Sequence, residues 1–358
     1  MSSVSDQPAG QVGRVSPTEA LIDGILAGHV RSVSRCISLI ENDTEEAAAI
    51  LQRIDREAGK AAIVGVTGVP GAGKSTLVPA LARRLAERGK HPAILAVDPS
   101  SPITGGAILG DRIRDSSAAE LGLFFRSVAS RGNLGGLSRT LDDVVTLLDA
   151  AGFDAILIET VGTGQSEVAI TRLAHTTLAV TAPGLGDEIQ AMKAGILEVA
   201  DIMVVNKLDI DTIGAETTAD TIRTVLSLGT RAHGLKEGVN PPAHGEPERW
   251  LAPVRAVSAL SGKGLDELLD LILAHHAFLD SSGLAQRRLA QRRSARFREA
   301  LRDALLAHVG GARGTELAAI EEAVGRGERN PIGAAQDLAR AIVAGANASI
   351  HPMKGAAR

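Results

Sequence analysis

A glycine-rich stretch between residues 65 and 76 ends in a lysine and two hydroxyl side chains, and it has the spacing of a phosphate-binding loop. From Gly68 to Ser75 it fits the pattern G-x-x-x-x-G-K-[ST] without a mismatch. Its glycines let backbone N–H groups turn toward phosphate, Lys74 can reach the outer phosphates, and the Ser75 hydroxyl can ligate Mg²⁺. An apolar run precedes the stretch and a helical pattern follows it, so the phosphates would lie at a helix N-terminus. The alternative is a glycine-rich turn between a strand and a helix. The residues predicted to bind nucleotide here are Gly68, Val69, Pro70, Gly71, Ala72, Gly73, Lys74, Ser75 and Thr76.

Two carboxylates stand at the ends of apolar runs that read as strands. Asp98 ends the run that starts at residue 93, and Glu159 ends the run that starts at residue 153. Ligands collect at the carboxyl ends of strands in doubly wound sheets, and P-loop nucleotidases hold Mg²⁺ with an acid at such a strand end, usually Asp. Glu159 and Gly162 form an E-x-x-G variant of the usual D-x-x-G signal. The alternative for Glu159 is a cap on the next helix.

A second motif, N-K-x-D, follows a later apolar run and consists of Asn206, Lys207 and Asp209. An aspartate at this position can accept hydrogen bonds from N1–H and the exocyclic amine of guanine, whereas adenine offers no matching donors. Leaving a buried acceptor unpaired costs on the order of 1–3 kcal/mol, so this motif predicts GTP rather than ATP. The turn Ser258, Ala259 and Leu260 follows the last expected strand and could donate backbone N–H groups to the guanine oxygen, although any surface turn would look similar.

Composition excludes several classes of protein. The 358 residues carry 38 Lys+Arg against 42 Asp+Glu, and five Phe, one Trp and no Tyr leave few surfaces for stacking nucleobases. The charge balance argues against a partner that is nucleic acid or a membrane surface. One cysteine, Cys36, allows neither an intramolecular disulfide nor a zinc site, and no apolar run approaches the roughly 18 residues of a spanning helix. We expect a cytoplasmic protein.

The elements that position these motifs alternate between strands and helices, which predicts an α/β fold: a doubly wound, mainly parallel sheet of the P-loop NTPase type, flanked by helices. The expected regions are a disordered N-terminus at 1–17, a helical N-terminal extension at 18–57, a nucleotide-binding domain at 58–280 and a helical C-terminal region at 281–358. Arginines at 287–298 could bind nucleic acid, but nearby acids favour a solvated helix. Apolar stripes in this region predict a two-fold homodimer, unless they fold back on their own domain.

With these motifs in place, the sequence resembles the MeaB/ArgK group of GTPases from about Ala20 onward. The most specific residues of the resemblance are Val97-Asp98-Pro99-Ser100-Ser101, Gly105-Gly106, Leu109-Gly110-Asp111, Ile158-Glu159-Thr160-Val161-Gly162, Gly164-Gln165-Ser166-Glu167, Gly186-Asp187 and Gln190. It implies binding of GTP and GDP with Mg²⁺, metal handling by Ser75, Asp98, Asp111 and Glu159, and catalysis by the last three together with Lys74. It also implies switches at 103–111, 161–167 and 184–193.

The resemblance further implies a homodimer through the C-terminal helices and a chaperone that gates adenosylcobalamin delivery to an acyl-CoA mutase and protects or reactivates it. Its client could act on methylmalonyl-, ethylmalonyl-, isobutyryl- or 2-hydroxyisobutyryl-CoA. The sequence departs from the group at Thr163 and at 182–185, which bears on how the third switch touches its client. Two other readings are a nickel-insertion GTPase, which scattered histidines disfavour, and an ATP-dependent kinase of transport proteins, which the N-K-x-D motif disfavours.

Overall fold

The computed structural model describes residues 16–98, 122–129, 134–160, 170–185, 199–232 and 250–350. Asp111, Gly162 and most of the three expected switches lie outside these ranges, and so does the expected disordered start apart from its last two residues. The chain separates into two compact units, residues 1–292 and residues 293–358, and each is described by itself.

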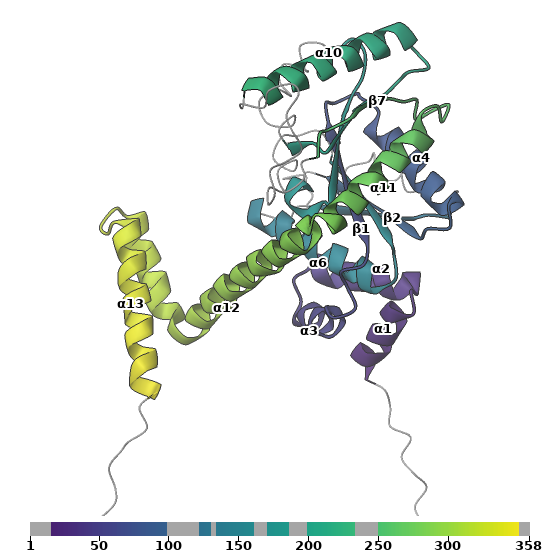
Figure 1. Ribbon diagram of the computed structural model, residues 1–358. Helices are drawn as coiled ribbons and strands as arrows, with labels where there is room; N and C mark the ends of the chain where they lie inside the picture. Colours follow the sequence, from purple (N-terminus) through teal and green to yellow (C-terminus); the bar gives the residue numbers. More distant parts are fainter. Residues whose placement is uncertain are drawn as a thin grey trace, which may run out of the picture. The chain divides into compact units, whose positions relative to one another are not determined.

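Unit 1 is built on a parallel sheet with helices around it (Figure 1). Within the described ranges the sheet has seven strands in the order β3-β2-β4-β1-β5-β6-β7. All six strand pairs are parallel. The strands are β1 (Ala62–Gly68), β2 (Pro92–Asp98), β3 (Phe124–Ala129), β4 (Ala155–Thr160), β5 (Thr176–Thr181), β6 (Ile202–Val205) and β7 (Val254–Ala256). The doubly wound α/β fold expected from the sequence is confirmed.

Helices cover both faces of the sheet, which is why its central strands are apolar on both sides. One face packs against α4 (Lys74–Glu87), α10 (Thr212–Ala232) and α11 (Leu265–Ser281), and the other against α1 (Pro17–Leu26), α2 (Val30–Glu41), α3 (Glu45–Ile54) and α6 (Leu134–Ala150). Side chains of β1 alternate between these two cores: Val64 and Val66 face α4, and Ile63 faces the N-terminal helices. Helix α10 ends at Ala232.

Two of the three N-terminal helices, α1 and α3, begin at side-chain caps, and α2 is tied to the sheet by an ion pair. Ser16 forms a capping box with Glu19 at the start of α1, and the Thr44 hydroxyl accepts from the N–H of Ala47 at the start of α3. The Arg126 guanidinium of β3 lies 2.8 Å from Glu41 at the end of α2. The amphipathic pattern therefore produces helices whose apolar faces complete one core of unit 1.

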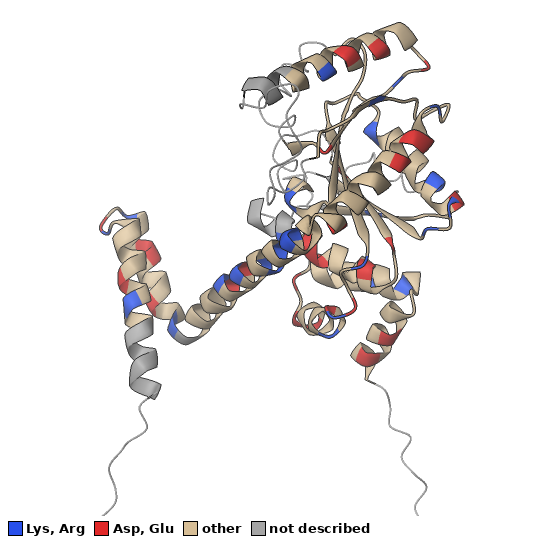
Figure 2. Ribbon diagram, viewed as in Figure 1, with Lys and Arg blue, Asp and Glu red and all other residues tan. Residues whose placement is uncertain are grey.

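Unit 2 consists of most of α12 (Leu284–Gly325) and of α13 (Pro331–Ile350). Helix α12 has a kink at Arg313 (φ −134°), whose non-helical backbone separates two helices. Figure 2 shows that basic residues concentrate in the first half of α12. In the described part of the chain, no helix is both long and apolar enough to cross a membrane.

Candidate nucleotide-binding site

The glycine-rich loop follows β1, in the middle of the carboxyl edge of the sheet. Gly68, the last residue of β1, has a φ of +135°, a conformation that is almost restricted to glycine. A Cβ atom on Gly68 would lie 2.0 Å from the carbonyl oxygen of Val180 on β5, and the next N–H, that of Val69, donates to the same oxygen at 3.2 Å. The loop is thus seated directly on the neighbouring strand, which only a residue without a side chain permits.

Lys74 is buried and bends back over the loop. Its Nζ donates to the carbonyl oxygens of Gly68 at 2.6 Å and Val69 at 3.0 Å. Lys74 is also the first residue of α4, behind Gly73 in a left-handed conformation at φ +86°. The first turn of a helix leaves N–H groups without intrahelical acceptors and carries a partial positive charge. The ammonium group of Lys74 and the N-terminus of α4 together form a site suited to anionic oxygens.

The carboxylate of Glu159 lies at the end of β4 with only 3% of the residue exposed. The register pairs Glu159 with Val66 of β1 on one side and with Ala96 of β2 on the other. Since Val66 packs in the core that contains α4, Glu159 belongs to the same face of the sheet as the helix that begins at Lys74. Asp98 ends β2, so its backbone lies at the same edge as Glu159.

Asn206 links the glycine-rich loop to the turn after β7. Its side chain is 2% exposed; Nδ2 donates to the carbonyl of Ala72 at 2.9 Å, and Oδ1 accepts from the N–H of Ala259 at 3.0 Å. A Cβ atom on Gly73 would lie 2.6 Å from Nδ2 of Asn206, so this glycine is needed for the close approach. The amide therefore fixes the distance between two segments that the sequence assigned to opposite ends of a nucleotide.

Two loops from neighbouring strands form the other end of the site. The N–H of Leu208 donates to the carbonyl of Val257 at 3.0 Å, which holds the loop of Asp209 beside the turn of Ser258. Asp209 is exposed, Lys207 adopts a positive φ of +66°, and Leu260 is 80% exposed. The structure thus brings together the described site residues that the sequence singled out. Sequence reasoning missed the bridge by Asn206, because N-K-x-D spacing gives no partner for the amide.

A separate buried cluster lies at the opposite ends of β5 and β6. The Nδ1 atom of His275 lies 2.9 Å from the Thr176 hydroxyl, and its Nε2 lies 3.3 Å from Asp201 Oδ1. The Trp250 Nε1–H donates to the Asp201 carbonyl at 2.7 Å. Burial lowers the pKa of His275, and likewise that of His175, to about 4, whereas burial raises the pKa of Asp201. Both imidazoles are therefore neutral at pH 7.

Comparison with known proteins agrees with this geometry. Residues 33–313 match the family described as "Methylmalonyl Co-A mutase-associated GTPase MeaB". A putative GTPase of Pyrococcus horikoshii is 43% identical over 80% of this chain and 84% of its own length, and the GTPase ArgK of Escherichia coli is 36% identical over 72% and 76%. A solved structure titled "LAO/AO transport system kinase" superposes with a TM-score of 0.63 at 25% identity, over 91% of this chain and 97% of that one. The chain belongs to the MeaB family and is a P-loop GTPase that binds guanine nucleotides.

Proposed function

We propose that this GTPase is a chaperone of an adenosylcobalamin-dependent acyl-CoA mutase, gating its cofactor loading and protecting or reactivating it. Support comes from the family description, which names association with methylmalonyl Co-A mutase, over residues 33–313. The observation that carries the nucleotide-dependent part is the Asn206 amide, which joins the glycine-rich loop to the turn at Ala259. A ligand that fills both ends of this site would contact both the glycine-rich loop and the turn at Ala259, so its binding would affect elements on both sides of the central strand.

In this proposal the phosphates occupy the loop from Gly68 to Thr76, and the base lies between Asp209 and the turn 258–260. Lys74, now bonded to two loop carbonyls, would move its ammonium to the outer phosphate oxygens. The exposed side chain of Leu260 would be covered by the base, which removes apolar surface from water.

The predicted guanine contact is tested by Asp209→Asn. The amide can donate to the extra carbonyl of xanthine, so the variant should shift its preference from GTP toward xanthosine triphosphate. Wild-type protein that bound ATP as tightly as GTP would refute the assignment. The same comparison of ATP with GTP affinity tests the alternative of an ATP-dependent kinase, which tighter binding of GTP would contradict.

The predicted Mg²⁺ site fits the donors that the structure describes. Mg²⁺ prefers oxygen ligands, and it would neutralise charge on the phosphate oxygens when bound. The buried carboxylate of Glu159 and the hydroxyl of Ser75, at the start of α4, would hold it, with Asp98 and Asp111 completing the set.

Hydrolysis should be slow in the isolated protein. Phosphoryl transfer needs a positioned water and compensation of developing charge, and Lys74 supplies much of the latter. No glutamine directly follows Gly162, and no arginine finger is assigned. Lys74→Ala should abolish tight nucleotide binding or turnover, and an acyl-CoA mutase should raise the wild-type rate. Turnover of many per second without a mutase, and no response to any, would contradict the proposal. Copurification of the native protein with its mutase would identify the client.

We also propose a two-fold dimer through unit 2. Large apolar side chains along α12 are between 45% and 65% exposed at Phe297, Leu301, Leu305 and Leu306. The first three follow one another at intervals of four residues and thus share one helix face. A second copy would bury this stripe. Leu301→Asp combined with Leu305→Asp should convert the dimer to a monomer in light scattering, and a wild-type monomer at micromolar concentration would refute the proposal.

A further inference from the structure

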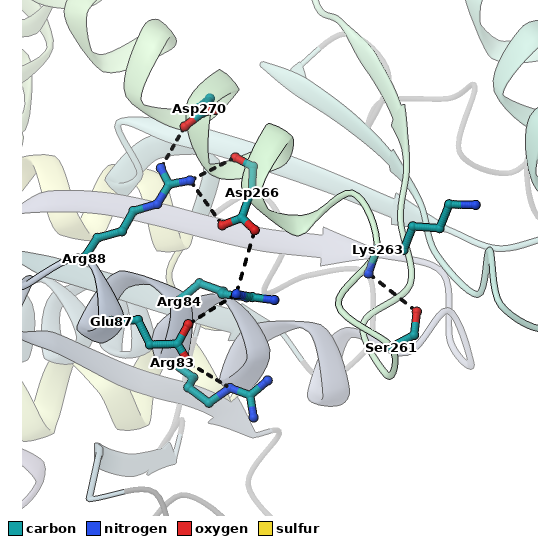
Figure 3. A network of polar contacts seen from close by, with 8 residues as sticks. All are labelled: Arg83, Arg84, Glu87, Arg88, Ser261, Lys263, Asp266 and Asp270. Atoms are coloured by element: carbon teal, nitrogen blue, oxygen red, sulfur yellow. Dashed lines mark hydrogen bonds and ion pairs between the residues drawn. The ribbon is translucent and has the colours of Figure 1, made fainter.

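Arg84 of α4, the C-cap residue Arg88 that follows this helix, and two aspartates of α11 form a network on the surface of unit 1 (Figure 3). Arg88 Nη1 lies 2.7 Å from Asp270 Oδ1, and Arg88 Nη2 lies 3.2 Å from Asp266 Oδ1. Arg84 Nη1 lies 3.8 Å from Asp266 Oδ2. The members are four residues apart on each helix, so each pair shares one helix face and the contacts form a ladder between the helices.

The two helices belong to opposite ends of the candidate site. Helix α4 begins at Lys74, directly behind the glycine-rich loop, and α11 begins at Leu265, directly behind the turn that contains Ala259. Beneath the ladder, Leu81 of α4 and Leu268 of α11 are buried in the same core. Each helix is therefore connected directly to one end of the site, and the ladder joins the two helices at the surface of unit 1.

Arg84 also packs against the turn itself. A Cβ atom on Gly262 would lie 3.0 Å from Nη2 of Arg84, and Gly262 has a φ of +82°. The turn is closed by bonds of its own: the N–H of Ser258 donates to the Lys263 carbonyl at 2.8 Å, and the N–H of Gly262 donates to the Ser258 carbonyl at 2.9 Å. Movement of α11 would consequently carry the whole turn with it.

We propose that Arg84 and Arg88 are positioning residues for guanine: they hold the turn 258–260 at the distance from the phosphate loop that a nucleotide spans. This inference depends on the proposed placement of the base. The Asn206 amide fixes the turn from inside, and the arginines fix it from the surface. A site held in its bound geometry loses less conformational freedom when the ligand binds. The arginines contact no part of the ligand, so their effect depends on the base and disappears for a ligand that has only phosphates.

The expected effect is moderate, because Asp266 and Asp270 side chains are 53% and 68% exposed and those of the arginines about one-third exposed. Exposed ion pairs each contribute little, so removing the ladder should weaken GDP binding by roughly two- to tenfold. Most of the change should be faster dissociation.

The test compares GDP with inorganic tripolyphosphate on the full-length protein. Arg84→Ala combined with Arg88→Ala should weaken GDP binding two- to tenfold and leave tripolyphosphate binding unchanged. Asp266→Asn combined with Asp270→Asn removes the same contacts from the other helix and should give the same pattern. The matched control is Arg83→Ala, because Arg83 pairs with Glu87 on its own helix at 3.7 Å; it should change neither affinity.

Three results would overturn the inference: unchanged GDP affinity in both double variants, an equal loss for GDP and tripolyphosphate, or an Arg83→Ala effect as large as that of Arg84→Ala with Arg88→Ala. The wild-type comparison of GTP with ATP is a separate readout. Guanine selectivity in the wild type together with normal GDP binding in the double variants refutes the positioning role alone. Equal affinity of the wild type for GTP and ATP refutes the proposed placement of the base.

Discussion

Replacing Gly68 by alanine should destabilise unit 1 more than the same change at Gly71, although both glycines belong to one loop and both have positive φ. Gly68 has φ +135° and Gly71 has φ +75°. The added methyl group at Gly68 would lie 2.0 Å from the Val180 carbonyl oxygen and 2.7 Å from its nitrogen, whereas at Gly71 it would meet no atom within 4 Å. The pair separates backbone strain from a steric clash.

The magnitudes follow from these distances. At Gly71 alanine has only the cost of a left-handed backbone, about 1–2 kcal/mol. At Gly68 the strain is about 1–3 kcal/mol, and relieving the clash requires β1 and β5 to separate where the Val69 N–H donates to the Val180 carbonyl, which removes roughly another 1 kcal/mol. The total of about 2–4 kcal/mol lowers the melting temperature by roughly 4–12 °C, at about 2–3 °C per kcal/mol for a domain of this size.

Thermal unfolding followed by far-UV circular dichroism measures both variants. Nucleotide must be absent, because a bound ligand stabilises by mass action and would mix affinity with fold stability. Gly71→Ala should melt within about 6 °C of the wild type. The reasoning fails if Gly68→Ala melts with the wild type, or if Gly71→Ala is destabilised as much as Gly68→Ala.

Further predictions concern buried polar groups. Asn206→Ala leaves the buried carbonyl of Ala72 and the buried N–H of Ala259 unpaired. The variant should lower the free energy of unfolding by about 2 kcal/mol or more and weaken GDP binding. Urea unfolding that matches the wild type would contradict the bridging role of Asn206. His175 and His275 have folded pKa values of about 4, below the ordinary 6.5 of a histidine side chain, so the unfolded chain binds more protons between these two values. Stability should therefore fall as pH drops from about 6.5 to 4, with the raised pKa of Asp201 offsetting part of the loss. Substituting both histidines by glutamine should flatten that dependence, and an unchanged slope would be evidence against it. Cys36 is buried and has its pKa raised to about 12, mainly by burial, so it should react with a thiol reagent only after unfolding, and rapid modification of the native protein would contradict this.

The local elements and the principal motifs could be predicted from the sequence. The alternation of apolar runs with amphipathic segments indicates strands and helices directly, since burial imposes these periods on neighbouring residues. The glycine-rich loop could be recognised as well, because its glycines at 68, 71 and 73 adopt positive φ, which explains why glycine stands at these positions.

Only the tertiary structure determined the contacts between residues that lie far apart in the chain. The order β2-β4-β1 places Glu159 between Ala96 and Val66, and strand order is not contained in the apolar pattern of any one strand. The bridge from Asn206 to Ala72 spans 134 residues, and the ion pair from Arg88 to Asp270 spans 182. Periodicity shows which face of an element is buried, but not which neighbour covers it. That choice is made only when the whole sheet and its helices pack together.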